Sequence, residues 1–455
     1  MKVLESVLID SINRSLAFLQ DKLQFLAENS FIVKNLDNII FGLICFSLVT
    51  SLFLPTELIG ISACVVITLV VLKLLLHKGQ NLSLISCNLV LIIFLIISFI
   101  SVVNSTLFHQ SLYGFSKTLI YFGFYFSVIQ YLRFNKDKII PLLLFIALLC
   151  SIESFYGIFQ NTLGLSNIST WQDTSYVNPE DVLSRVYGTL QPYNPNLFAA
   201  YLIVSFSSII AAVFLAFEKK NMKAFVISLI SLLACVVTIV LTGCRGAYIA
   251  LFSIGLMFLA ASWHVVNKDF VNENLQKLWK QVVAWAFGLG VFFILITPSV
   301  LKRILSIFIL REDSSTSFRM NVYHSSFQMF CDNWILGIGT GNKTFREIYG
   351  LYMLSGYDAL SCYSVFLEIL VESGIFALIS YLIFLYILII SAVKAFISAK
   401  NLRYKVILFS CISSVIAVMV HGIFDTIYFR PQIQLLYWIM VAITVTMVTM
   451  DEKTI

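Results

Sequence analysis

Apolar runs of about 16 to 25 residues alternate with shorter polar connectors along most of the chain. A helix of that length crosses the hydrocarbon core of a bilayer, so each run predicts a transmembrane helix. The tenth run is the longest, and we expect its helix to tilt or break. About twelve spans are predicted, at residues 38–54, 57–76, 82–103, 116–133, 139–158, 197–217, 225–242, 246–263, 283–298, 363–392, 406–422 and 431–449.

The first 36 residues carry a different pattern. Leucines and isoleucines recur at helical spacing from Leu4 to Leu26, with charged residues between them. This pattern predicts an amphipathic helix over residues 1–36 on the cytoplasmic surface of the membrane. No apolar core precedes a small-residue cleavage site, so we expect no cleavable signal. Residues 37–455 are then one transmembrane domain.

Composition supports the membrane interpretation. Of 455 residues, 59% are hydrophobic and 12% are charged, whereas a soluble domain carries roughly 25% charged residues. We therefore expect an all-α polytopic membrane protein. The chain has no basic, aromatic-interleaved soluble module, which excludes nucleic acid as a partner. Scattered histidines, the lack of clustered carboxylates and the lack of a Walker motif lead us to expect no metal and no other cofactor.

The basic residues are distributed unevenly. When the 30 Lys and Arg residues are assigned to alternating sides of the membrane, about 20 fall on the side of the termini and about 10 on the other. Cytoplasmic loops are enriched in Lys and Arg, so both termini are predicted to be cytoplasmic and the loop over 299–362 external. A basic external loop indicates an anionic ligand. Its basic residues are Lys302, Arg303, Arg311, Arg319, Lys343 and Arg346.

Three arginines are candidates for binding that anion. Arg185 lies just outside the membrane with few acidic neighbours. Arg245 lies in a connector of about four residues, and an arginine at bilayer depth is costly and usually functional. Arg319 and Tyr323 are four residues apart, on one face of a helix in the external loop. The alternatives are solvation of Arg185 and snorkelling of Arg245 to the interface.

Two carboxylates are candidates for acid/base chemistry. Glu368 and Glu372 are four residues apart, so they share a face at the external start of the tenth span. Glu372 is the deeper of the two in the bundle. The alternative is that they form salt bridges with Arg319 or Arg245.

Several polar residues are expected to support the site. Asn194, Pro195 and Asn196 predict a helix start, with an asparagine cap followed by proline at the first helical position. Asp425 and Arg430 are expected to form a structural pair near the external boundary.

Two features of the external loop are less specific. The glycine-rich run 337–341 is similar to a phosphate-cradling turn, but it lacks the preceding strand and the Lys-Ser/Thr of a P-loop. A disulfide between Cys331 and Cys362 is one alternative for the loop cysteines, although spacing alone does not establish bridge geometry.

The motifs occur in a recognisable order over residues 185–435. They are Arg-x-x-Gly-Thr and Asn-Pro-Asn, then Thr-Gly-Cys-Arg-Gly, Arg-Met-x-x-Tyr, Trp-x-Leu-Gly-x-Gly, Tyr-Ser-x-x-Leu-Glu and Asp before Arg-Pro. This order resembles the O-antigen ligase and polymerase superfamily of bacterial envelope-glycan proteins. The segments that start at Ser361 and Phe429 are most similar to the branch described as bicarbonate transporters.

The resemblance implies a GT-C-like helical bundle in the bacterial inner (cytoplasmic) membrane. It implies a glycosyltransferase that needs neither a metal nor a nucleotide sugar. The donor would be a glycan on undecaprenyl pyrophosphate at the external leaflet, and other envelope-glycan assembly proteins are possible partners. Arg245 falls on the family's Ser-Arg-Gly arginine and Arg319 on its loop arginine. With Arg185, they would hold the pyrophosphate.

One departure from the family matters for the chemistry. Ligases of this family carry a His-Asn pair at the positions of Tyr363 and Ser364. An unperturbed tyrosine has a pKa of about 10 and is a poor base at neutral pH. The candidates to replace the histidine are Glu372, Glu368 and His324.

Three functions therefore remain open from the sequence. The first is a membrane glycan polymerase or ligase. The second is a protein associated with inorganic-carbon (bicarbonate) transport, in which the same arginines bind a small anion. The third is an inactive scaffold for envelope-glycan assembly.

Overall fold

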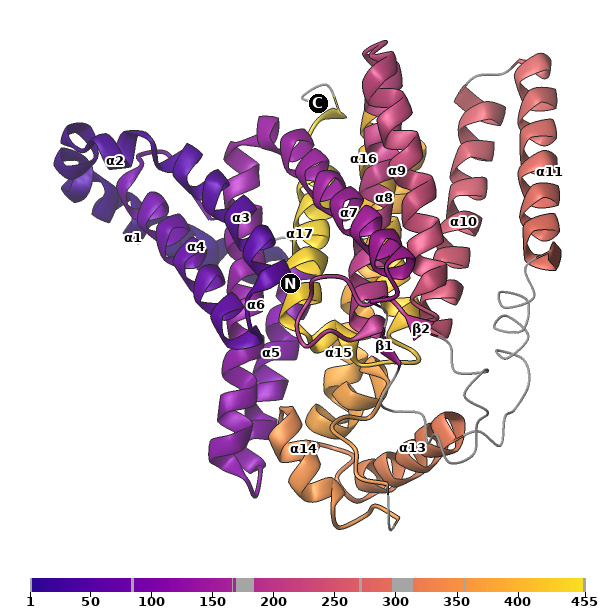
Figure 1. Ribbon diagram of the computed structural model, residues 1–455. Helices are drawn as coiled ribbons and strands as arrows, with labels where there is room; N and C mark the ends of the chain where they lie inside the picture. Colours follow the sequence, from indigo (N-terminus) through magenta and orange to yellow (C-terminus); the bar gives the residue numbers. More distant parts are fainter. Residues whose placement is uncertain are drawn as a thin grey trace.

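The computed structural model describes residues 2–82, 86–165, 167–168, 184–269, 272–296, 314–354 and 357–452. Helices form nearly all of it, and the predicted all-α membrane fold is confirmed (Figure 1). Its first half contains α1 Lys2–Asn29, α2 Phe31–Lys34, α3 Leu36–Phe53, α4 Thr56–Leu76, α5 Ser86–Asn104, α6 Phe108–Phe134, η1 Lys136–Lys138, α7 Ile139–Thr162, β1 Asn167–Ile168, β2 Ser184–Arg185, α8 Pro195–Glu218 and α9 Met222–Leu241. Its second half contains α10 Arg245–His264, η3 Val265–Asp269, α11 Glu273–Ile296, α13 Ser314–Asp332, α14 Asn342–Tyr349, α15 Val365–Ser398, α16 Leu402–His421, η4 Ile427–Phe429 and α17 Pro431–Thr449.

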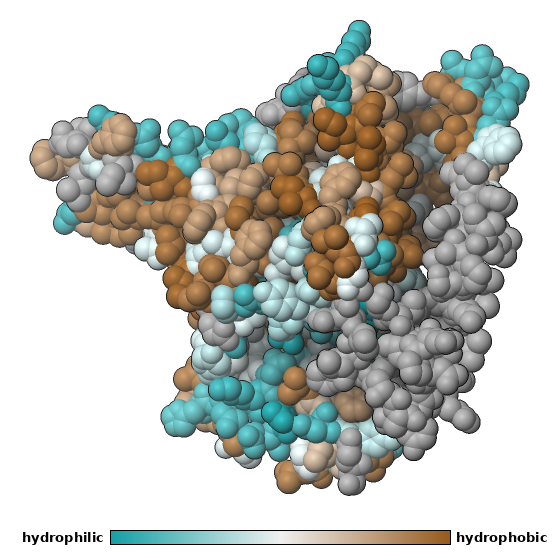
Figure 2. Space-filling view, viewed as in Figure 1, coloured by the Kyte–Doolittle hydropathy of each residue, from teal (hydrophilic) through white to brown (hydrophobic). Residues whose placement is uncertain are grey.

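Each predicted span coincides with a helix. Among the described residues, 10 helices are long and apolar enough to cross a membrane. The two other predicted spans, 116–133 and 283–298, lie within α6 and at the end of α11. Figure 2 shows a hydrophobic surface over the middle of the helices and hydrophilic residues gathered at both ends. This distribution is the one that a bilayer requires of a polytopic protein.

Helices α8, α16 and α17 form the centre of the bundle. In their most apolar windows, 83%, 78% and 89% of the residues are buried, against 11% for α10. Small side chains allow α8 and α16 to approach closely. Ser410 Oγ donates to the Ser207 carbonyl, and Ser413 Oγ donates to Ser207 Oγ at 2.8 Å. These three helices therefore fix the framework on which the loops are placed.

The amino-terminal helix α1 is anchored to the end of α4 and to the connector after it. Gln20 Nε2 of α1 donates to the carbonyls of Leu74 at 2.8 Å and Gln80 at 2.9 Å. Asn13 Nδ2 donates to the Leu82 carbonyl at 3.0 Å, and its Oδ1 accepts from the Leu82 N–H at 2.8 Å. The predicted helix over residues 1–36 is present, divided into α1 and α2. Its placement on the cytoplasmic surface stays a prediction.

The described part of the loop predicted over 299–362 lies at one end of the bundle (Figure 1). Its helices α13 and α14 are at the end opposite to the carboxyl terminus (Figure 1). Lys302, Arg303 and Arg311 lie outside the described residues.

Cys331 offers a direct test of the predicted topology. It is the exposed cysteine of α13, whereas Cys45 and Cys64 are partly buried in apolar helices. If the loop is external, a membrane-impermeant maleimide should label Cys331 in intact spheroplasts, and Cys331→Ser should remove the signal. Labelling only after the inner membrane is permeabilised would contradict the topology.

Candidate functional site

The predicted break in the tenth span lies at Gly374 of α15. Its φ of 78° and ψ of −179° belong to a backbone region that is essentially open to glycine alone. The break releases carbonyl groups that a continuous helix would use. Ile338 N donates to Val371 O, and Gly339 N donates to Glu372 O, both at 3.0 Å. The loop is thereby hydrogen-bonded into the interrupted helix.

The glycine-rich run 337–341 is therefore an anchor, and the alternative of a phosphate cradle is wrong. Besides the two amides that pair with α15, Thr340 N donates to Ser111 Oγ at 2.8 Å. A side chain at Gly337 would meet the backbone of Glu372. The glycines are needed because the loop backbone packs directly against helix backbone.

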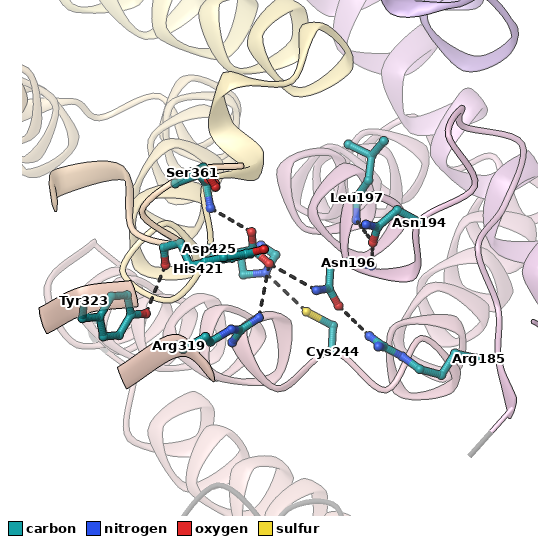
Figure 3. Close-up of polar contacts among 12 residues, drawn as sticks. Arg185, Asn194, Asn196, Leu197, Cys244, Arg319, Tyr323, Ser361, His421 and Asp425 are labelled. Atoms are coloured by element: carbon teal, nitrogen blue, oxygen red, sulfur yellow. Dashed lines mark hydrogen bonds and ion pairs between the residues drawn. The ribbon is translucent and has the colours of Figure 1, made fainter. Parts of the chain in front are cut away.

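Two of the three candidate arginines meet through Asp425 (Figure 3). Arg185 Nη2 donates to Asn196 Oδ1 at 2.5 Å, and Asn196 Nδ2 donates to Asp425 Oδ2 at 3.2 Å. Arg319 Nη2 lies 3.6 Å from the same Asp425 oxygen. Asp425 was expected to pair with Arg430, but it pairs with Arg319 instead, and Arg430 is exposed at the start of α17. We call Arg185, Asn196, Asp425 and Arg319 the arginine cluster.

The start of α8 positions Asn196 within this cluster. Asn194 accepts hydrogen bonds from Asn196 N at 2.8 Å and Leu197 N at 3.4 Å, so the predicted helix cap is present. Proline at the first helical position has the fixed φ that a helix start needs. Arg185 is held separately, because its Nε donates to the Thr242 carbonyl at 2.6 Å.

The electrostatics of the cluster favour an anion. Its members carry two guanidinium charges and one carboxylate. Burial lowers the pKa of Arg185, and the charge of Arg319 acts in the same direction, while Cys244 and Asp425 oppose it. Arg319 remains 28% exposed, so it is accessible to a ligand. An anion would relieve the repulsion between the two guanidinium groups.

Aromatic residues hold Arg319 in place. Its guanidinium carbon lies 5.7 Å from the centre of the Tyr363 ring, within the range of a cation–π contact. Phe318 packs edge-on against the same ring, with centroids 5.8 Å apart. Tyr323, one turn after Arg319, donates to the Tyr363 carbonyl at 3.1 Å. Tyr363 is therefore a support for Arg319.

Tyr363 is also unsuited to act as a base. Burial raises its pKa above the ordinary value, and Asp425 adds to the effect while Arg319 opposes it. Its hydroxyl stays protonated at neutral pH. His324, another candidate, is exposed on α13.

The two candidate carboxylates are buried in α15. Glu368 is 1% exposed and Glu372 is 7% exposed. Glu368 Oε2 accepts from Cys362 N at 3.4 Å. The expected alternative of salt bridges with Arg319 is wrong, because Arg319 pairs with Asp425. In the part of the chain that the structure describes, neither carboxylate belongs to any of the ion pairs found.

Sequence reasoning missed a buried thiol–imidazole pair beside the cluster. Cys244 Sγ lies 3.4 Å from His421 Nε2 (Figure 3). His421 is the last residue of α16, and Asp425 follows in the short connector to η4, so the two are close in the sequence. Gly246 gives the ring room, since a side chain there would meet the His421 imidazole. Arg245 begins α10 directly after Cys244 and is partly buried; its convergence with Arg319 stays a prediction.

The alternative of a disulfide between the loop cysteines is wrong. Cys331 is exposed and Cys362 is buried, and both are free thiols.

The comparisons with known proteins identify the region around α13. The family model described as O-antigen ligase matches residues 229–382 of the chain. This range contains Arg245, Arg319, Glu368 and Glu372. No curated protein matches the chain. Over residues 229–382, about a third of its length, the chain is therefore similar to the O-antigen ligase family.

Proposed function

We propose that the protein is a glycan polymerase or ligase of the bacterial inner membrane, and that it transfers a glycan from an undecaprenyl-pyrophosphate donor at the external face. The family match supports the general activity, that of a membrane glycan ligase or polymerase. The arginine cluster is the observation that supports an anionic donor. It combines Arg319 from the matched region with Arg185 and Asp425 from outside it.

The arginines would bind the pyrophosphate of the donor. A guanidinium donates two parallel hydrogen bonds to phosphate oxygens, and it stays charged throughout the reaction. The bond between the anomeric carbon and the pyrophosphate oxygen breaks during transfer. The electron pair leaves with undecaprenyl pyrophosphate, whose added negative charge the arginines stabilise.

The acceptor would be activated by a buried carboxylate. Its hydroxyl oxygen forms the new bond to the anomeric carbon, and its proton passes to the carboxylate. Glu372 is our candidate for this general base, with Glu368 one turn away. Both carboxylates have a backbone hydrogen bond, from Cys362 to Glu368 and from Gly341 to Glu372. Glu372 is favoured because its Oε1 is buried and accepts no hydrogen bond from the described residues.

Arginine substitutions test the donor site. We expect Arg185→Ala and Arg319→Ala each to lower donor affinity roughly ten- to a hundredfold, because a lost charge-assisted hydrogen bond costs about 1.5–3 kcal/mol. Arg319→Lys and Arg245→Lys should also lower donor affinity, since lysine lacks the planar, forked set of N–H donors of arginine. The measurement is the KM for a lipid-pyrophosphate-linked glycan in proteoliposomes.

Arg346→Ala is the matched control for these variants. Arg346 lies in the same loop, but it pairs with Asp358 at 2.7 Å in an exposed salt bridge. Such pairs contribute little to stability, so this variant should transfer glycan normally. Equal losses in Arg319→Ala and Arg346→Ala would show that overall loop charge matters rather than the cluster.

Gene deletion separates the proposed function from its alternatives. A glycan polymerase or ligase should leave surface polysaccharide shortened or unattached, with normal bicarbonate uptake. Loss of uptake with an unchanged polysaccharide profile would support the transport alternative. If the deletion phenotype were restored by Arg319→Ala, the scaffold alternative would be supported.

A further inference from the structure

A second polar site lies in the bundle near the broken helix. A pocket with an empty volume of about 410 Å³, including its part open to solvent, lies among α5, α6, α15 and α17. Aromatic rings form part of its lining. The lining also includes residues with side-chain oxygen atoms, namely Ser98, Thr118, Thr340, Glu372, Ser373 and Gln434.

Three of these oxygens are buried and unsatisfied. Ser98, Glu372 and Gln434 are 1%, 7% and 4% exposed. Ser98 Oγ, Glu372 Oε1 and Gln434 Oε1 have no hydrogen-bond partner among the described residues. Buried polar atoms are nearly always hydrogen-bonded, and each buried atom without a partner lowers the free energy of unfolding by about 1–3 kcal/mol. Three buried oxygen atoms without partners in the lining of one pocket therefore indicate a ligand.

The chemistry of the three atoms selects the ligand. The carboxylate and amide oxygens are acceptors, and a hydroxyl oxygen can also accept. Their common partner must be electropositive. Water would satisfy the hydrogen bonds, but it would not balance the charge of an ionised Glu372, and a buried carboxylate without a cation avoids that cost by taking up a proton. Calcium takes about 6–8 oxygen ligands and magnesium needs near-ideal octahedral geometry, whereas the single carboxylate here balances one positive charge.

We propose that the pocket binds a small monovalent cation of the sodium class, through Ser98, Glu372 and Gln434. This proposal goes beyond the proposed function, because it concerns how a buried carboxylate is kept ionised in the absence of substrate. Only an ionised Glu372 can accept a proton from an acceptor hydroxyl. Tyr381 and Tyr428 also line the pocket.

Thermal stability of the purified full chain in nanodiscs tests the proposal without any glycan. The protein is titrated with sodium chloride against choline chloride at constant ionic strength. A ligand that binds the folded state raises Tm in a saturable way, and we expect a rise on the order of 2 °C or more for sodium. A parallel rise in choline, or no rise in either salt, would overturn the proposal.

Variants locate the effect. Glu372→Gln and Gln434→Leu should abolish the sodium-dependent rise, and the milder Ser98→Ala should shift it to higher sodium concentration. Gln432→Leu is the matched control: Gln432 is in the same turn of α17, but it donates to the Gln191 carbonyl at 2.9 Å and does not line the pocket. Its response to sodium should persist.

The variants also separate this proposal from the proposed function. If Tm of Glu372→Gln still rose with sodium, the cation would bind elsewhere and the proposed site would be wrong, whatever that variant does to glycan transfer. If Glu372→Gln did not fold, the Ser98→Ala titration would decide, because an unchanged midpoint contradicts the site.

Discussion

Glu372→Gln should abolish glycan transfer, while Tyr363→Phe should leave most of it. The first change removes the group that takes the proton from the acceptor, and a general base contributes about 10²- to 10⁴-fold to a rate. The second removes a hydroxyl that stays protonated and keeps the ring that packs on Arg319. The measurement is polysaccharide formed by cells that carry each variant in a deletion strain.

Folded yield is the control for this pair. If Glu372 only stabilised the bundle, its glutamine variant would lose monodisperse protein together with activity. A well-folded Glu372→Gln protein with unchanged polysaccharide would remove Glu372 from the mechanism. Glu368→Gln provides the comparison for a second buried carboxylate of the same helix, whose Oε2 already accepts from the Cys362 amide.

The bundle was predictable because its signal is local. Long apolar runs locate helices whatever their neighbours are. The great length of the tenth run predicted a tilt or a break, and the structure has a break at Gly374. Helix ends were less predictable. The predicted span 116–133 is part of α6, which begins at Phe108. The first two turns of α6 contain polar residues, so hydropathy alone did not include them in the span.

The partners of the site residues were not predictable, because they come from distant segments. Arg185, Asn196, Arg319 and Asp425 each have a local explanation, and only the fold brings them together. Asp425 was expected to pair with Arg430, its neighbour in the sequence. Local spacing cannot choose between a near partner and one delivered by another helix.

The glycine-rich run 337–341 shows the same limit. Its composition fits either a turn that binds phosphate or a loop segment whose backbone packs closely against the backbone of another element. The structure decides for the second, since its amides donate to α15 carbonyls and to Ser111. The run therefore contributes to the site indirectly, by fixing the end of the loop against the helix that carries Glu372.

Gly374→Ala should prevent the loop from docking and should strongly reduce the amount of folded protein. The backbone at Gly374 is essentially open to glycine alone, and a non-glycine residue there costs about 1–3 kcal/mol. The new methyl group would also meet the carbonyl of Ile335. Moving the loop away would break the hydrogen bonds from Ile338 and Gly339, each contributing about 1 kcal/mol. Together these effects predict a loss of about 3 kcal/mol or more.

Gly60→Ala is the matched control for Gly374→Ala, and size-exclusion chromatography with thermal unfolding is the measurement. Gly60 lies inside α4, and a methyl group there meets nothing within 4 Å. Alanine favours a helix interior over glycine by about 1 kcal/mol, so this variant should be at least as stable as the parent. A Gly374→Ala protein with normal yield and Tm would mean that α15 can close into a continuous helix. The glycine-rich run would then not be the anchor of the loop that carries α13 and α14, and Glu372 would lose the backbone contact that now holds its turn of the helix in place.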